Sequence, residues 1–98
     1  MEIRLDSPIL QFDGSIIPKD VEGTPFTLKD VLVNVLGNFT QGTGEEKIHA
    51  CHLGIEVFGQ DVAITFSETD RHFAIRLVKN SSYPALVVGK ATKLLEGA

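Results

Sequence analysis

The densest group of reactive side chains in this 98-residue sequence is the tetrapeptide His49-Ala50-Cys51-His52. In a helix, residues three positions apart are neighbours, so the two imidazoles would lie close together. Thiolate and imidazole are ligands that suit zinc and copper. The segment therefore gives one hypothesis, a small metalloprotein that uses His49, Cys51 and His52.

The rest of the sequence offers this group little support. Structural zinc sites use four ligands, usually from two separated pairs, but the chain has one further histidine, His72, and no second cysteine. A nucleophilic cysteine needs an accessible position and a lowered pKa, whereas Cys51 belongs to an apolar stripe. We therefore expect no metal ion and no cofactor, a core position for Cys51, and histidines that face nearby glutamates on the helix surface.

Acid–base chemistry is the second hypothesis, because Asp61, Glu68, Asp70 and His72 surround one expected turn. Paired carboxylates and a histidine are the groups that general acid–base catalysis uses. However, a Ser67 to Asp70 spacing is that of a helix-capping box, in which the carboxylate binds a backbone amide. We therefore expect solvated turn residues here and a protein that is not an enzyme.

Composition and charge exclude several partner classes. Hydrophobic residues make up 43% and charged residues 22% of the chain, and its length predicts a single small globular domain over residues 1–98. The net charge is −4, with nine scattered Lys and Arg residues, which disfavours nucleic acid because phosphate binding relies on basic side chains. No apolar run approaches the roughly 20 residues that span a bilayer, and the first ten residues do not resemble a signal peptide. We expect a cytoplasmic protein without a membrane partner.

Helix-start signals recur along the chain and set the expected architecture. A Ser or Thr stands three residues before an acidic residue at Thr27, Thr43 and Ser67, and a weaker signal lies at Ser82-Tyr83-Pro84. Each precedes an apolar stretch of helical length. Asp13-Gly14, between the short apolar runs 9–12 and 16–17, predicts a β-hairpin. The alternation over 62–66 predicts a third strand that joins it. The expected fold class is α+β, an N-terminal β-hairpin plus a short third strand packed on four short helices.

The second expected helix is apolar on two sides. One stripe contains Ile48, Cys51 or His52, Ile55 and Phe58, and the other contains Ala50, Leu53 and Val57. We expect the first stripe to face the core. Leu53 and Val57, together with Val33 of the first helix, would then form an exposed apolar patch for a protein partner. Gly54 costs about 1 kcal/mol relative to Ala inside a helix, which indicates close packing around it.

Four blocks carry a family resemblance: TLKDVLVNVL at 27–36, GEEKIHACHLGIEVF at 44–58, VAITFSETDRHFAIRLVKN at 62–80 and YPALVVGKATKLLEG at 83–97. Together they resemble small, largely uncharacterised proteins encoded by tailed bacteriophages and prophages. The resemblance covers about four fifths of the chain. It implies a phage origin, a place in the host cytoplasm or the virion, and no catalytic residues.

The sequence therefore predicts a non-enzymatic phage protein that acts through protein–protein contact. We expect either self-association or one protein partner, from the phage or the host, in a virion or assembly role. An alternative is an inhibitor of a host enzyme or an anti-phage immune complex. Such an inhibitor would place its acidic side chains on one face, so that they occupy a basic groove.

Overall fold

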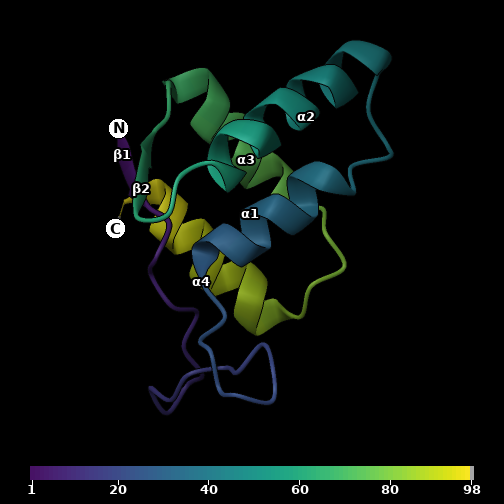
Figure 1. The fold of residues 1–98 in the computed structure, drawn as a ribbon. Helices are drawn as coiled ribbons and strands as arrows, with labels where there is room; N and C mark the ends of the chain where they lie inside the picture. Colours follow the sequence, from purple (N-terminus) through teal and green to yellow (C-terminus); the bar gives the residue numbers. More distant parts are fainter. Residues whose placement is uncertain (98) are drawn as a thin grey trace.

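Four helices and two short strands follow one another along residues 1–97, the part of the chain that the computed structural model describes (Figure 1). This confirms the expected α+β class. In chain order the elements are β1 (Glu2–Arg4), α1 (Leu28–Gly37), α2 (Gly44–Phe58), β2 (Ala63–Thr65), α3 (Glu68–Lys79) and α4 (Ala85–Glu96).

The expected helix starts are confirmed by the hydrogen bonds at the helix ends. Thr43 accepts a bond from the Glu46 amide at 3.1 Å, and its own amide donates to the Glu46 carboxylate at 3.0 Å. This reciprocal arrangement satisfies backbone amides that the first turn of α2 leaves without helical partners. At α1 the Thr27 amide donates to Asp30 at 2.9 Å. The start of α4 follows Pro84 and has no side-chain cap.

The sheet differs from the prediction. β1 pairs antiparallel with β2, with Ile3 opposite Ile64, so the 62–66 segment forms its ladder with the first residues of the chain. Ile3 and Leu5 are buried while their neighbours are exposed, which is the alternation of a half-buried strand. The sheet therefore has two strands, and the expected hairpin contributes neither.

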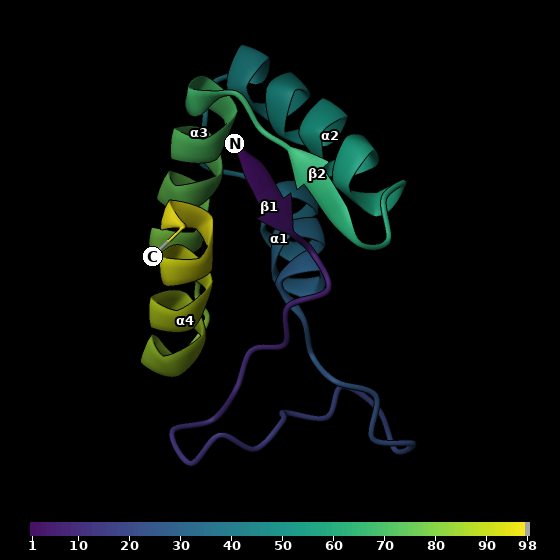
Figure 2. The same cartoon turned by 90° about the vertical axis from the view of Figure 1, so that its left-hand side faces the viewer.

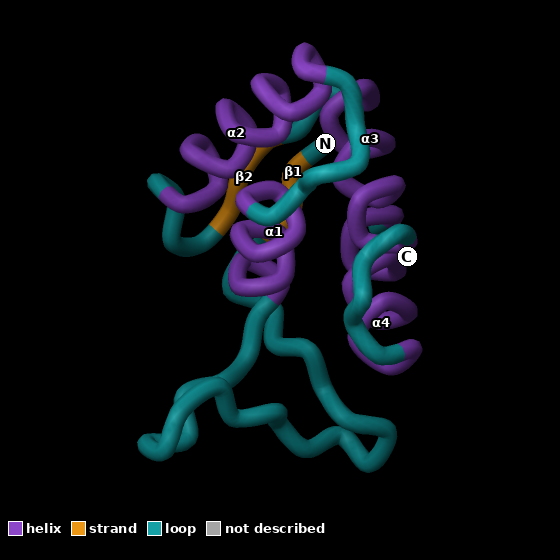
Figure 3. Tube along the Cα trace, turned by 90° about the vertical axis from the view of Figure 1, so that its right-hand side faces the viewer, coloured by secondary structure: helices purple, strands orange, loops and turns teal. Residues whose placement is uncertain are grey.

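Residues 8–27, named here the N-terminal arm, extend from the body as a long loop (Figures 2 and 3). The expected turn is present, with Gly14 at φ +87°, but a single bridge between Leu10 and Ile16 replaces the expected strand pair. An isolated two-stranded hairpin is marginal in water, because it lacks a third strand or a helix to pack against. Phe12, near the turn, is 89% exposed.

The faces of α2 are reversed relative to the prediction. Ala50, Leu53 and Val57 lie in the core, while Ile48, Ile55 and Phe58 are exposed; Cys51 is exposed as well. The physical reason is the approach of α1: a Cβ built on Gly54 would lie 3.4 Å from the Leu36 Cβ. Leu53 and Val57, on the same side of α2, are buried.

Two of the three residues expected in a partner-binding patch are therefore core residues. Leu53 is 3% exposed and Val57 is fully buried. Val33 is half-buried on α1 and packs against the edge of the core. The expected core position of Cys51 is likewise corrected, because its stripe faces outward.

The reversal of α2 gives a paired test. Val57→Asp places a charge in the core, which costs several kcal/mol. This cost is a large part of the roughly 5–15 kcal/mol by which a small domain is stable. We expect this variant to lack cooperative thermal unfolding by circular dichroism. Ile55→Asp, two residues away on the opposite face, should keep the helical spectrum and a cooperative transition. The reverse pattern would show that α2 is turned the other way.

Candidate functional site

The exposed stripe of α2 is the most prominent candidate site, and it is named here the outer face of α2. It consists of Ile48, Cys51, Ile55 and Phe58, whose spacings of three, four and three place them along one side of the helix. Ile48 is 58%, Ile55 65% and Phe58 69% exposed. Burial of large apolar side chains in a contact contributes about 25 cal/mol per Å² of apolar area removed from water. An apolar stripe of this kind is typical of a protein-binding surface.

One end of the outer face joins α1. The Lys29 ammonium lies 5.4 Å from the centre of the Phe58 ring and 3.3 Å from the Asp61 carboxylate. Val33, Lys29 and Phe58 line a depression of about 350 Å³ at this junction. Val33, one of the three expected patch residues, therefore lies beside an exposed apolar side chain. The depression adds a concave edge to an otherwise convex helix face.

His49 ties α2 to α3 and does not point to the outer face. Its Nε2 lies 2.8 Å from the Asp70 carboxylate, and its ring stacks on Phe73 with centres 4.6 Å apart. Asp70 was expected to complete a capping box; Ser67 Oγ does accept the Asp70 amide at 3.1 Å, but the carboxylate turns to His49. The expectation that His49 faces the glutamates of its own helix is therefore corrected.

A second tie between α2 and α3 is the ion pair of Glu46 and Arg76. The Glu46 carboxylate accepts from the Arg76 guanidinium and from the Thr43 amide, and these bonds hold the Glu46 pKa below its usual 4.5. Arg76 also lies 5.2 Å from the centre of the Phe73 ring. Both ties hold the inner side of α2, so they fix which side is presented outward.

The residues of the metalloprotein hypothesis are not brought together. His49 points to α3, whereas Cys51 and His52 are exposed. Within residues 1–97, no three His, Cys, Asp or Glu side chains are arranged to hold a metal ion.

The residues of the acid–base hypothesis are dispersed among ion pairs. Asp61 pairs with Lys29, and Asp70 pairs with His49. Glu68 bonds to Arg71 at 2.6 Å and lies 3.7 Å from His72, on the surface of α3. This placement accounts for each carboxylate by a surface ion pair or by the tie to α2.

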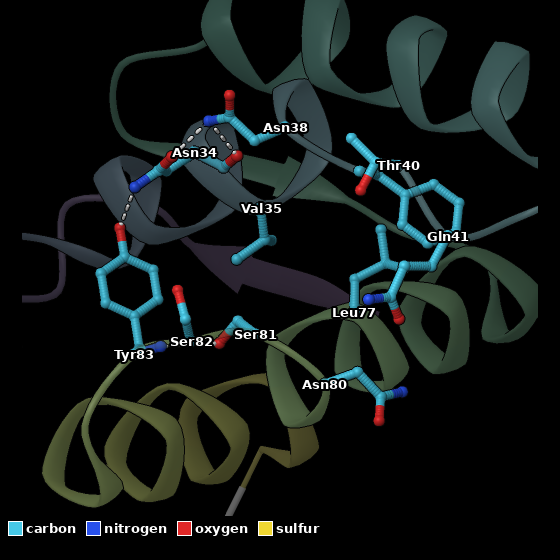
Figure 4. A pocket seen from close by; sticks show the side chains of 11 residues that line it. Asn34, Val35, Asn38, Thr40, Gln41, Leu77, Asn80, Ser81, Ser82 and Tyr83 are labelled. Atoms are coloured by element: carbon cyan, nitrogen blue, oxygen red, sulfur yellow. Dashed lines mark hydrogen bonds between the residues drawn. The ribbon is translucent and has the colours of Figure 1, made fainter.

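A pocket of about 300 Å³ with several asparagine side chains in its lining lies where the C-terminal ends of α1 and α3 meet (Figure 4). Asn34 donates to the Tyr83 hydroxyl at 2.6 Å, as the figure shows. Asn38 donates to the Asn34 carbonyl at 2.9 Å, and Asn80 to the Arg76 carbonyl at 3.0 Å. These amides bond to one another and to carbonyls in the last turns of their helices. Sequence reasoning missed the pocket, although asparagine directly after a helix is a known end signal.

Many of the acidic side chains are paired with basic ones, which bears on the acidic face that the inhibitor alternative requires. Six of the thirteen carboxylates are in ion pairs within the described residues; they belong to Asp6, Asp30, Glu46, Asp61, Glu68 and Asp70. Pairing lowers the negative potential available to a distant basic groove. The inhibitor alternative therefore gains no support from this geometry.

Comparison of the chain with protein-family models, with curated proteins and with solved structures finds no match. The resemblance to tailed-phage proteins stays a prediction. Among residues 1–97, no helix is long and apolar enough to cross a membrane.

The low pKa of Glu46 predicts acid sensitivity. Because this pKa is lower in the folded than in the unfolded state, the stabilisation is complete above about pH 4.5 and is lost as the pH falls through the folded-state pKa. Glu46→Gln should lower the melting temperature at pH 7. Between about pH 5 and pH 3, the melting temperature of this variant should fall less than that of the parent chain. Glu22→Gln is the control, since Glu22 is exposed, lies away from α2 and forms no ion pair within residues 1–97. Identical pH profiles for all three proteins would contradict this assignment.

The exposed position of Cys51 predicts rapid thiol labelling. In dilute native protein, Cys51 should react with a chromogenic disulfide reagent at nearly the rate measured in denaturant. A buried thiol would react only through unfolding and would be slowed by roughly 10³-fold or more. Such protection in dilute protein would show that the outer face of α2 is covered by the chain itself.

Proposed function

We propose that this protein is a non-enzymatic interaction module that binds a protein through the outer face of α2. The observation that carries the proposal is the apolar stripe of Ile48, Ile55 and Phe58, exposed on a helix whose opposite side already fills the core. A helix in a small domain needs only one apolar side for folding. In this proposal, the second apolar side of α2 serves to contact another protein molecule.

The surroundings of the stripe are those of an interface. Phe58 supplies an aromatic side chain, a residue type enriched at interface cores, and Lys29 holds one face of its ring. Glu45, Lys47 and Glu56 are exposed charged residues on the same helix. An apolar centre with a charged rim supports specific docking, because the centre supplies affinity and the rim selects orientation.

The proposed setting is the life cycle of a tailed bacteriophage or prophage. The sequence resemblance supports this origin, and the exposed helix face supports a role in assembly over one in chemistry. In this proposal the protein acts in the host cytoplasm or in the virion. Its partner is a second copy of the chain, another phage protein or a host protein.

The test places a photo-crosslinking amino acid at position 55 and, as a control, at position 93, which is exposed on α4. Both proteins are expressed and illuminated in the same host, with and without phage genes. We expect covalent protein products from position 55 and none of the same products from position 93. In the position-55 protein, Phe58→Ser should reduce the yield about tenfold or more, since loss of a central anchor costs about 2 kcal/mol.

The mass of the product identifies the kind of partner. A product of twice the chain mass indicates self-association, and any other mass indicates a different protein. Absence of products from position 55, or equal products from both positions, would contradict the proposed function.

A further inference from the structure

We propose that the occupant of the outer face of α2 is a second copy of this chain, whose own α2 packs parallel to the first about a twofold axis. This inference rests on the proposed function and specifies its partner. Figures 1 and 2 show α2 at the edge of the fold, with α1, β2 and α3 to its inner side. Two independent features of the stripe select a second, parallel copy.

The first feature is the spacing of the apolar residues. Ile48 and Ile55 lie seven residues apart, and Cys51 and Phe58 repeat the same interval three positions later. This is the a and d pattern of a helix that packs on another helix. In parallel two-stranded pairs, β-branched residues are favoured at a and leucine at d; the d positions here are Cys51 and Phe58. Both a positions here are isoleucine.

The second feature is the distribution of charge along the two edges of the stripe. At 100° per residue, Lys47 projects from the same edge as Phe58, whereas Glu45 and Glu56 project from the opposite edge. Within residues 1–97, ion pairs include none of these three side chains, although the neighbouring Glu46 pairs with Arg76. The outer face of α2 therefore has one basic edge and one acidic edge, and both charges are free.

Twofold symmetry turns this pattern into a choice of direction. In a parallel pair the axis runs along the helices, so the basic edge of one copy meets the acidic edge of the other on both sides. In an antiparallel pair the axis crosses the helices, so each edge meets its own kind. Opposite charges at a contact favour the parallel pair, and like charges disfavour the antiparallel one. The pairing of Lys47 with Glu45 of the second copy is the expected rim contact.

In the parallel arrangement, Cys51, the chain's single cysteine, lies opposite Cys51 of the second copy, so disulfide formation can test it. Each residue of the stripe lies opposite its own equivalent, so every layer can form a symmetric disulfide. Residues 48 and 58 lie ten positions apart, or about 15 Å along a helix. An antiparallel pair cannot bring both positions close to their equivalents at once. A disulfide requires Cα atoms within about 7 Å.

The experiment measures mass by light scattering over a concentration series, then oxidises the protein and identifies the linked residues. Three single-cysteine proteins are compared: the natural chain with Cys51, and Cys51→Ser combined with Ile48→Cys or with Phe58→Cys. Cys51→Ser combined with Lys93→Cys is the control for random collision. We expect a dimer mass for the natural chain, and symmetric disulfides at 51 and 48 that exceed the control at least tenfold. The symmetric disulfide at 58 should also exceed the control, but by less, because Phe58→Cys removes an anchor of the contact.

Two outcomes would overturn the inference. A monomer at all concentrations, with cross-linking at the control level, would exclude the second copy; products with another protein from position 55 would then leave the proposed function standing. The Ile48→Cys and Phe58→Cys proteins are also oxidised as an equal mixture. A dimer that links 48 to 58 in this mixture, while neither protein links to itself, would exclude the parallel direction.

Charge reversal tests the same pair without altering the apolar stripe. Lys47→Glu should lower the dimer fraction of the natural chain, and adding Glu45→Lys should restore it, because the rim contact is re-formed with reversed signs. Loss of the dimer in both variants, with unchanged circular dichroism, would overturn the parallel arrangement.

Discussion

The packing of α2 on α1, through the side that carries Ala50, Leu53 and Val57, decides which side of α2 is left on the surface. A Cβ at position 54 would lie 3.4 Å from the Leu36 Cβ, at the short end of ordinary contact. Ala50 lies one turn earlier and is fully buried. With two small residues on one side, α2 lies close against α1 there, and its larger side chains on the opposite side remain in water. The outer face is thus a by-product of tight packing within the core.

The polar ties to α3 give this surface a fixed orientation. His49 bonds to Asp70, and Glu46 bonds to Arg76, so α2 is held at two points along its inner side. Because each tie includes exposed or half-exposed groups, each contributes modestly to stability. Their structural effect is orientation: rotation of α2 about its own axis would break both. A surface held in one orientation loses less entropy on binding.

Sequence reasoning located the helices well because their end signals are local. Thr27, Thr43 and Ser67 each precede a helix by one residue, and the strand over 62–66 was also recognised. The first strand was missed, although Ile3 and Leu5 alternate with polar residues. The segment around Asp13-Gly14 has the expected turn, but Leu10 and Ile16 form a single bridge and no strand pair. Turn chemistry alone does not supply the further strand or helix that a hairpin needs. Local patterns thus predicted where elements begin more reliably than what they pack against.

The candidate site was harder to predict for a related reason. Both stripes of α2 are apolar, and volume alone favours burial of Ile48, Ile55 and Phe58. Gly54 was the signal for the opposite choice, because it lies on the side of α2 that packs against Leu36 of α1. Its contact with α1 depends on a distant residue, so the sequence shows that close packing exists near Gly54 but not which larger residues it buries. The tie of His49 to Asp70 depends in the same way on a distant residue, because Asp70 of α3 lies 21 positions after His49 in the chain.

The most direct test of this account is a methyl NMR spectrum of the isolated protein, recorded over a dilution series. The methyl signals of Ile48 and Ile55 should move with concentration, because a second copy covers them. Those of Ile3 and Ile9, which are at most 1% exposed, should stay in place. Isoleucine signals that are all independent of concentration, or movement confined to residues outside α2, would contradict the claim that its outer face binds a second copy.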